Sequence, residues 1–282
     1  MITMKIAGLA LAVILGATVV PSPALAGDYP WLGVRPPVRS LGQAIAPPPG
    51  FHRIDLKDNG FASWLRRLPL LPDGTETKLW TGEPKKNQAA HIAVVDLDVG
   101  KQNLQQCADA IMRLRAEYLW SSGHQREIAF HGADGQLLRW AGGSREAFGR
   151  YLREVFNRAS TASLHRELAT PGKGEAVQPG DVLVHPAGKY HKLGHAVLVL
   201  DAAEDAKGNR VVLIGQSYTP AQQFEVLINT REPQLSPWYS EAKLDTQDPD
   251  VRVGLRTPSW MWPFRRGDVK RFPQPKQVGA AR

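Results

Sequence analysis

The chain has 282 residues, a formal net charge of +8, 43% hydrophobic residues and a single cysteine, Cys107. One cysteine excludes a disulfide framework, and the length is ample to bury a core without such cross-links. The charge is uneven, because seven Lys or Arg and one Asp lie between Arg256 and Arg282, which leaves the rest of the chain nearly neutral.

The first 26 residues have the pattern of an export signal. Lys5 precedes the apolar run Ile6–Val20, and the small residues Ala24 and Ala26 mark a cleavage site. We therefore expect a mature chain that begins at Gly27 in the periplasm or outside the cell, where nucleic acid is not an expected partner. No later stretch is long and apolar enough to predict a membrane span.

The chain divides into three parts after the signal. Residues 27–50 are rich in Pro and Gly and predict a linker or a strap across the surface, while residues 51–240 predict one α+β domain. Residues 241–282 form a basic, aromatic tail. This tail is expected either to be solvated or to lie on an anionic membrane surface through Trp260, Trp262 and Phe264.

The stretch Leu104–Trp120 predicts an amphipathic helix that carries the only cysteine. Asn103 is its expected N-cap, and Gln106 has the spacing of a capping box. Apolar residues recur at intervals of three and four, and Cys107 is one of them. The thiol should therefore face the interior or a cleft.

Other helices and strands surround this helix in the sequence. Before it we expect a short helix closed by Pro69 and strands at Thr77–Trp80 and Ala90–Asp96. After it come a hairpin around Asp134-Gly135, a helix capped by Ser144 and a helix at Thr161–Leu168.

The second half of the domain alternates with a period of two. This pattern predicts four strands in an antiparallel meander, at Asp181–His185, His195–Asp201, Arg210–Gln216 and Gln223–Ile228. With the cysteine helix, they predict an α+β fold whose helix packs on an antiparallel sheet of about four to six strands.

The meander suggests a base for the thiol. If Asp201 pairs with Arg210, His195 lies opposite Gln216 on the same face of the sheet. Cys107 would then be a nucleophile, His195 its general base and Gln216 the group that orients His195. A shift of one residue in the pairing would move Gln216 to the other face.

Other interpretations remain open for these residues. Free cysteine is among the most buried residue types, so Cys107 can also be a core residue. The spacing of His185, His191 and His195 matches no strong zinc signature, and we expect no metal and no cofactor. Three aromatic residues can form a wall for a glycan or peptide or belong to the core: Tyr218, Trp238 and Tyr239.

One arrangement of residues resembles the NlpC/P60 group of papain-like cysteine peptidases and amidases. It consists of a cysteine at a helix start, Gly180-Asp181 opening a sheet, His195 beginning a strand and Gln216 on the next strand. The group usually has Asp directly before its cysteine, where this chain has Gln106. The resemblance implies a papain-like fold and hydrolysis of peptide or amide bonds in bacterial cell walls.

Longer motifs resemble a second family. Four motifs are similar to the uncharacterised secreted bacterial family called domain of unknown function 4846. They are DLDVGKQNLQQCADAIMRLRAEYLW, GHAVLVLDAAED, GQSYTPAQ and SPWY. We therefore expect an exported cysteine hydrolase acting on cell-wall peptide or a related amide. The alternative is a non-catalytic cell-envelope protein that uses the same fold for binding or as a scaffold.

Overall fold

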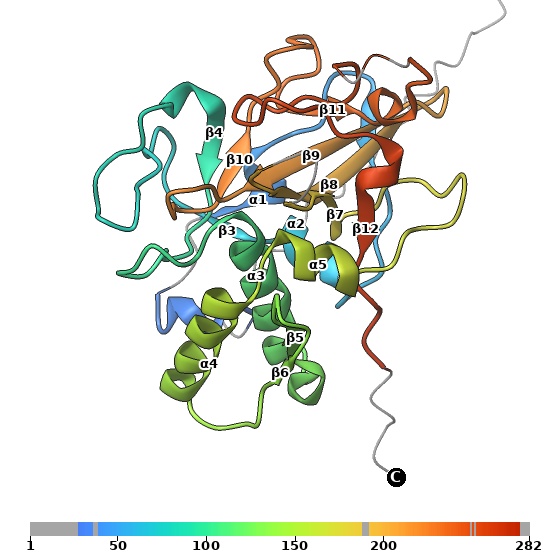
Figure 1. The fold of residues 1–282 in the computed structure, drawn as a ribbon. Helices are drawn as coiled ribbons and strands as arrows, with labels where there is room; N and C mark the ends of the chain where they lie inside the picture. Colours follow the sequence, from blue (N-terminus) through green and yellow to red (C-terminus); the bar gives the residue numbers. More distant parts are fainter. Residues whose placement is uncertain (1–27, 36–38, 188–191, 249, 251, 277–282) are drawn as a thin grey trace, which may run out of the picture.

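The computed structural model describes residues 28–35, 39–187, 192–248, 250 and 252–276. The expected export signal lies outside these residues. The described part is a mixture of helices and strands (Figure 1). None of the helices in these ranges is both long and apolar enough to cross a bilayer.

The main sheet has eight strands, and all of its pairs are antiparallel. Its path runs β12-β7-β8-β9-β10-β4, while β2 pairs with β8 and β11 with β9. The predicted count of four to six strands is wrong, because short strands near both ends of the chain join the meander. The strands are β2 (Phe51–Arg53), β4 (His91–Val94), β7 (Asp181–His185), β8 (His195–Asp205), β9 (Arg210–Gln216), β10 (Glu225–Leu227), β11 (Tyr239–Ser240) and β12 (Val269–Arg271).

Two small sheets and five α-helices complete the fold. β1 (Arg39–Ser40) pairs with β3 (Pro69–Leu70), and β5 (Ala129–His131) forms the predicted hairpin with β6 (Leu137–Arg139). Ser144 caps α4 as predicted. The helices are α1 (Leu41–Ala44), α2 (Phe61–Arg66), α3 (Cys107–Ser121), α4 (Arg145–Arg158) and α5 (Thr161–Glu167).

Each face of the main sheet has its own apolar core. On one face, Leu198 and Leu200 of β8 pack with residues of α2 and α3, including Ile111. On the other face, Val197 and its neighbours pack against the C-terminal segment, including Phe264. Figure 1 shows α2, α3 and α5 on one side of the sheet and the C-terminal segment, in orange and red, on the other. Alternate residues of β8 thus face different cores.

Helix α3 begins at Cys107, so the predicted start at Leu104 is wrong. Gln106 is the N-cap residue, and its backbone N–H donates to Asp109 Oδ2 at 3.1 Å. Asn103, the predicted cap, instead accepts a hydrogen bond from the backbone of Ala221 at 2.7 Å. The loop before the helix is therefore tied to the sheet, and Cys107 becomes the first helical residue.

The predicted register of β8 and β9 is also wrong. Asp201 pairs with Leu213 rather than Arg210, and an irregularity between Val199 and Asp201 shifts the register by one residue. Arg53 and Arg66 hold the buried Asp201 carboxylate at 2.8 and 2.7 Å. Because β8 continues to Asp205, the hairpin turn comes four residues later than the sequence pattern indicates.

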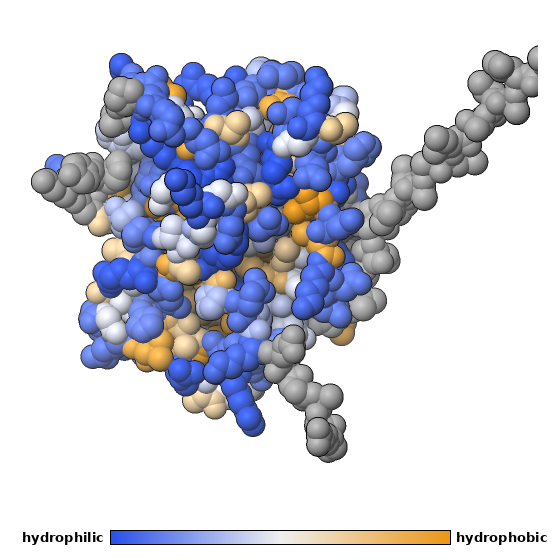
Figure 2. Space-filling view, turned by 90° about the vertical axis from the view of Figure 1, so that its right-hand side faces the viewer, coloured by the Kyte–Doolittle hydropathy of each residue, from blue (hydrophilic) through white to orange (hydrophobic). Residues whose placement is uncertain are grey.

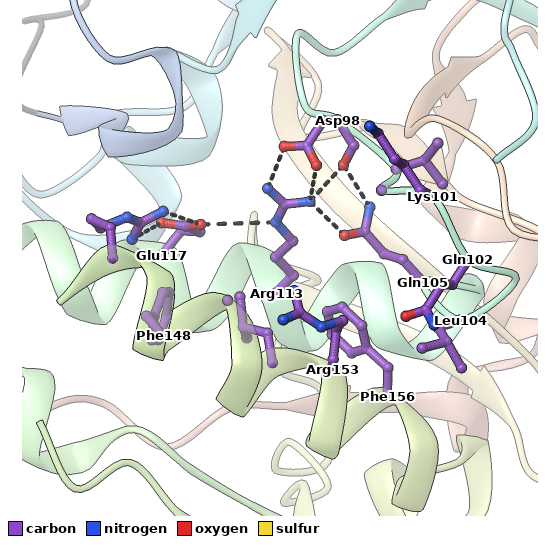
Figure 3. Close-up of a pocket in the computed structure, with 15 residues that line it drawn as sticks. Asp98, Lys101, Gln102, Leu104, Gln105, Arg113, Glu117, Phe148, Arg153 and Phe156 are labelled. Atoms are coloured by element: carbon purple, nitrogen blue, oxygen red, sulfur yellow. Dashed lines mark hydrogen bonds and ion pairs between the residues drawn. The ribbon is translucent and has the colours of Figure 1, made fainter. Parts of the chain in front are cut away.

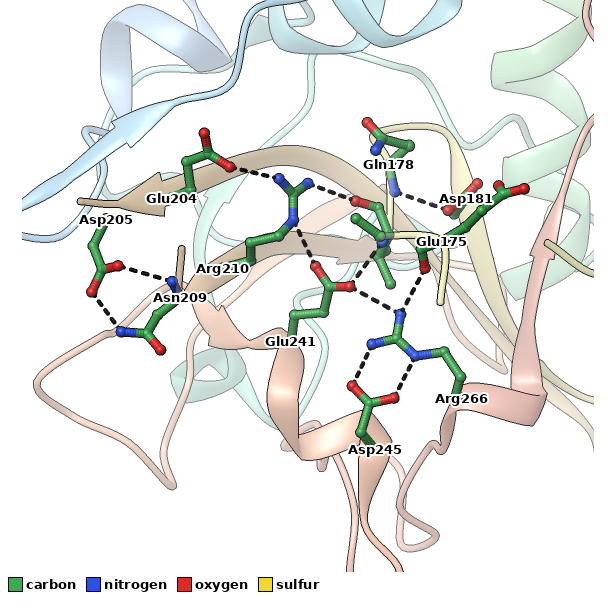
Figure 4. A network of polar contacts seen from close by, with 12 residues as sticks. Glu175, Gln178, Asp181, Glu204, Asp205, Asn209, Arg210, Glu241, Asp245 and Arg266 are labelled. Atoms are coloured by element: carbon green, nitrogen blue, oxygen red, sulfur yellow. Dashed lines mark hydrogen bonds and ion pairs between the residues drawn. The ribbon is translucent and has the colours of Figure 1, made fainter. Parts of the chain in front are cut away.

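The segment from residue 241 onward is not a free tail. Figure 4 shows Glu241 accepting hydrogen bonds from Arg210 and Arg266, at 3.0 and 2.9 Å. β12 adds to the edge of the main sheet beside β7. Phe264 is fully buried, so this ring of the expected membrane-binding set is part of the core. The face drawn in Figure 2 is mostly hydrophilic.

The segment predicted as a linker or a strap contains short regular elements in its described part. Tyr29 is fully buried, and its hydroxyl donates to the backbone oxygen of Trp64 at 2.8 Å. Helix α1 follows at Leu41–Ala44. The Pro-rich composition therefore marks a segment that packs on the domain.

The ion pair between Arg271 and Asp181 gives a stability prediction. Asp181 is 1% exposed, and Arg271 donates to both of its carboxylate oxygens at 2.6 and 2.8 Å. Arg271→Met should lower the free energy of unfolding by about 2–3 kcal/mol, because the carboxylate stays buried without its cation. Arg252→Met, which breaks an exposed pair with Asp250, should change it by less than about 1 kcal/mol in the same urea titrations. Equal losses would contradict the assigned role of Arg271.

Candidate functional site

Cys107 is the first residue of α3 and lies outside both apolar core clusters. Its side chain is 6% exposed but belongs to neither core cluster, whereas Ala108, the next residue, belongs to the helix-side core. The backbone of Ala196, the residue after His195, lies close enough to the thiol to lower its pKa. The sheet thus brings the cysteine next to the start of β8.

His195 is the first residue of β8 and is 2% exposed. Its Nε2 lies 2.8 Å from Oε1 of Gln216, the last residue of β9. The observed register, continued by one pair, places Gln216 opposite Val197, so His195 and Gln216 are diagonal neighbours on one face. Long side chains reach across such a diagonal. The predicted contact therefore forms, although the register that predicted it is wrong.

A third polar residue, Glu225, fixes the orientation of this pair. Gln216 Nε2 donates to Glu225 Oε1 at 3.1 Å, and the other carboxylate oxygen accepts from Thr77 and Lys85. A carboxylate only accepts hydrogen bonds, so the Gln216 amide must turn its NH₂ toward Glu225 and its oxygen toward His195. His195 must then carry its proton on Nε2, which leaves Nδ1 as the basic nitrogen.

Sequence reasoning missed Glu225 as part of the site. The available signal was a charged residue inside the predicted strand Gln223–Ile228, in which the next three residues are apolar. The side chain is fully buried together with Thr77 and Gln216, and Lys85 is 8% exposed. Buried charges are retained in proteins where they are paired, and Lys85 supplies the pairing charge.

Burial favours the neutral forms of Cys107 and His195. Burial raises the pKa of the Cys107 thiol to about 11, against an opposing hydrogen bond from Ala196. Burial also lowers the pKa of His195 to about 4, although the hydrogen bond to Gln216 acts in the opposite direction. Near neutral pH the site therefore holds a protonated thiol and an imidazole that is able to accept a proton. Among the described residues no hydrogen bond joins the sulfur to this ring.

Asp109 lies in the first turn of α3, two residues after the cysteine. It is 7% exposed, and its Oδ1 has no hydrogen-bond partner among the described residues. Burial raises the pKa of this carboxyl to about 8, so it is largely protonated at neutral pH. Its charge, when present, raises the pKa of Cys107 further.

This shift predicts a pH dependence of stability. An unfolded Asp releases its proton near pH 4, whereas folded Asp109 holds it up to about pH 8. The native state therefore binds more protons between these values, and stability falls as pH rises through this window. Asp109→Asn should remove this loss. At pH 8 its free energy of unfolding should exceed that of the native protein by at least about 1 kcal/mol. Asp58→Asn, at an exposed position, should leave the pH profile unchanged in urea titrations, and identical profiles for all three proteins would contradict the assignment.

Aromatic residues cover the candidate site. The rings of Tyr218 and Trp260 each lie 5.0 Å from the His195 ring, measured between centroids. The Tyr218 hydroxyl donates to the backbone of Ser259 at 2.7 Å, and Trp260 Nε1 donates to His185 Nδ1 at 2.9 Å. The C-terminal segment thereby closes the site from the side opposite α3.

Of the three predicted binding residues, only Tyr218 lies at the site. Trp238 is fully buried, and its indole N–H donates to the backbone of Ala46 at 2.8 Å. Tyr239 is 2% exposed and donates to the backbone of Ile228 at 2.6 Å. Trp238, directly before β11, belongs to the helix-side core, and Tyr239, the first residue of β11, belongs to the core on the other face of the sheet. The predicted aromatic wall is therefore wrong for Trp238 and Tyr239.

The described residues contain no group of three or more His, Cys, Asp or Glu that is placed to hold a metal ion. His185 accepts from Trp260 through Nδ1, and its Nε2 lies 3.1 Å from Asp268 Oδ2. His191, the third histidine of the zinc interpretation, lies outside the described residues.

Comparison with known proteins identifies a family but no activity. No curated protein and no solved structure matches this chain. One family model, described as domain of unknown function (4846), matches residues 41–145 and 140–271, which include Cys107, His195 and Gln216. The chain therefore belongs to the family called domain of unknown function 4846.

Proposed function

We propose that this protein is a cysteine hydrolase, a peptidase or amidase in which Cys107 is the nucleophile, His195 the base and Gln216 the orienting residue. The observation that supports it best is the chain of hydrogen bonds from Glu225 through Gln216 to His195 Nε2. This chain leaves His195 Nδ1 unprotonated, and the backbone of the next residue, Ala196, lies close enough to the thiol to lower its pKa. The arrangement resembles that expected of a papain-like site, in which the nucleophile lies at a helix start and the base at a strand start.

The proposed reaction begins when the Cys107 sulfur attacks the substrate carbonyl carbon and His195 Nδ1 takes the thiol proton. Backbone N–H groups in the first turn of α3 stabilise the negative oxygen, because they have no partner within the helix. His195 then gives its proton to the leaving amine as the carbon–nitrogen bond breaks. Water, activated by the same base, hydrolyses the thioester and restores the thiol.

Substrate entry requires a change in the cover of the site. Cys107 and His195 are 6% and 2% exposed, so a carbonyl group reaches the sulfur only if Tyr218 or Trp260 moves. Such a movement also brings solvent or substrate dipoles to the two groups. Both pKa shifts that burial causes should then become smaller.

The proposed substrate class is cell-wall peptide or a related amide of the cell envelope, reached after export to the periplasm or the exterior. This assignment rests on the signal pattern of residues 1–26 and on the resemblance to NlpC/P60 enzymes. An additional contact with an anionic membrane surface rests only on the basic charge after residue 256, since Phe264 is buried.

Peptidoglycan sacculi provide the test of this function. The mature protein should release new peptide fragments from them, detectable by mass spectrometry, and Cys107→Ala should release none. Because Cys107 lies outside both core clusters, this variant should keep its fold, which circular dichroism checks. The proposal is overturned if Cys107→Ala releases peptide fragments at the native rate. It is also overturned if the native protein releases no fragments from any of the sacculi and peptides offered.

The second candidate function is a non-catalytic envelope binding protein. The observation that favours it is the resting site itself, with a neutral thiol, a neutral imidazole and an aromatic cover. A binding protein would sediment with sacculi without releasing fragments, and Cys107→Ala would sediment equally well. Sedimentation together with a cysteine-dependent release would exclude this candidate.

A further inference from the structure

A cavity, which we call the arginine cavity, lies beside the aromatic cover of the candidate site. It is formed by the segment before β4, the loop after β10 and the C-terminal segment, and its volume is about 560 Å³. Its lining includes Arg231, Arg256, Ser259, Trp260 and Met261. Cys107, His195 and Gln216 do not line it, so it is distinct from the candidate catalytic site. Arg231 is exposed and Met261 is 70% exposed, so the arginine cavity is open to solvent.

Two arginines give this cavity its charge. Arg231 and Arg256 form no ion pair within the described part of the chain, and none of the described residues that line the cavity is Asp or Glu. Arg256 Nη2 donates to the backbone oxygen of Met261 at 2.9 Å, and Arg256 Nε has no hydrogen-bond partner among the described residues. The arginine cavity therefore carries an excess of two positive charges, and such an excess attracts an anionic group.

The buried arginines of another cavity, between α4 and the loop that precedes α3, are held by the protein's own carboxylates. There Arg113 donates to Asp98 at 2.7 Å (Figure 3), and Arg145 donates to both oxygens of the buried Glu117 at 2.9 Å. The two arginines of the arginine cavity have no such carboxylate among the described residues. A guanidinium that no protein carboxylate holds is available to a ligand, and a ligand carboxylate matches its planar shape with two parallel hydrogen bonds.

The arginine cavity shares a wall with the cover of the candidate site. Trp260 lines the cavity, and its ring lies 5.0 Å from the His195 ring, measured between centroids. Ser259 also lines the cavity, and its backbone oxygen accepts the hydrogen bond of the Tyr218 hydroxyl at 2.7 Å. Both rings that cover His195 are thus part of the cavity wall or attached to it. Since one extended residue spans about 3.5 Å, a group a few residues from the cleaved bond can reach the cavity.

We propose that the arginine cavity is a substrate subsite that binds a carboxylate of the peptide through Arg231 and Arg256. This inference rests on the proposed hydrolase function, because the peptide is the substrate of that reaction. It narrows the substrate class to peptides that carry a carboxylate within a few residues of the cleaved bond. Arg231 and Arg256 are binding residues in this proposal and take no part in the chemical steps.

Titration calorimetry with a matched pair of peptides tests the subsite. One is a soluble acidic peptide released from peptidoglycan, and the other is the same peptide with its carboxyl groups converted to amides. Cys107→Ala, which binds without turnover, should bind the acidic peptide at least tenfold more tightly than the amide form. Adding Arg231→Gln and Arg256→Gln should weaken binding of the acidic peptide at least tenfold. Arg231→Gln alone, at an exposed position, should keep the fold and still weaken binding severalfold.

A control with the same change of charge separates the cavity from the overall field of the protein. Arg126→Gln with Arg150→Gln, added to Cys107→Ala, removes two exposed arginines outside the cavity and should leave the affinity unchanged. The subsite is overturned if the acidic peptide does not bind or if its amide form binds as tightly. It is also overturned if the arginine variants of the cavity bind the acidic peptide as tightly as this control does.

Kinetics with the same two peptides distinguish a failure of the subsite from a failure of the hydrolase proposal. With Cys107 present, Arg231→Gln and Arg256→Gln together should raise KM for the acidic peptide at least tenfold, a larger effect than on kcat. If neither peptide is cleaved but binding of the acidic peptide depends on the two arginines, the carboxylate site stands and the hydrolase proposal is wrong. If both peptides are cleaved with equal KM, the hydrolase proposal stands and the subsite is wrong.

Discussion

His195→Ala should lower the rate of peptide release from sacculi by about 10²–10⁴-fold, the usual contribution of a positioned general base. The physical reason is that the neutral His195 ring offers Nδ1 to the thiol proton, once substrate entry relieves the burial that lowers its pKa to about 4. Without the ring, the thiol of Cys107, with a pKa of about 11, has no base to activate it. Initial rates of fragment release between pH 5 and pH 9 measure the effect.

His52→Ala is the matched control, because His52 is exposed on β2 and lies outside the site. It should release fragments at the native rate. A His195→Ala variant that is folded and as active as His52→Ala would remove His195 from the mechanism.

Lys85→Met should lower the free energy of unfolding by about 3–5 kcal/mol, the usual cost of removing one partner from a buried ion pair. Lys85 is the cation that pairs with the fully buried Glu225, and the methionine side chain replaces most of its apolar stem without the charge. Urea unfolding at neutral pH measures the loss. Lys86→Met, at the exposed neighbouring position, should change stability by less than about 0.5 kcal/mol.

A double variant separates the cost of the unpaired charge from other effects. Lys85→Met with Glu225→Gln removes both charges, and it should recover much of the stability that Lys85→Met loses. The same pair of variants also tests the orientation of Gln216. A glutamine at position 225 has donors as well as an acceptor, so it no longer forces the Gln216 oxygen toward His195. If the two single changes simply add, Lys85 and Glu225 do not act as a pair.

Local patterns in the sequence predicted most of the secondary structure. The hairpin at β5 and β6, the start of α4 after Ser144, and strands β7 and β9 lie where turn chemistry, capping and alternation placed them. These elements depend on neighbours within a few residues, which a sequence displays directly. The candidate site residues Cys107, His195 and Gln216 were proposed from the same patterns, although the register that paired His195 with Gln216 is wrong.

The predictions that were wrong concern features that depend on contacts between distant segments of the chain. The start of α3 is set by Asn103, whose side chain bonds the backbone of Ala221, 118 positions away. The β8–β9 register depends on Asp201, which Arg53 and Arg66 hold from outside the hairpin. The basic C-terminal segment looked solvated because its charges are frequent, but Arg266 and Arg271 have buried or half-buried acidic partners.

Glu225 illustrates why a site cannot be completed from the sequence. Its role depends on Gln216 on β9 and on Lys85 from a loop before β4, which the sheet brings to the same place. Alternation marked position 225 as part of a strand but could not say what lies beside it. The orientation of His195, and therefore the identity of its basic nitrogen, follows only from these contacts.

The most direct measurement of the central claim is intact-mass spectrometry of the protein during turnover of a soluble peptide released from peptidoglycan. The account predicts a transient increase in mass equal to the acyl part of the peptide, mapped by proteolysis to Cys107. The increase should be absent from Cys107→Ala and should form more slowly in His195→Ala. Hydrolysis of the peptide without any adduct at Cys107, at a rate that Cys107→Ala retains, would contradict the account.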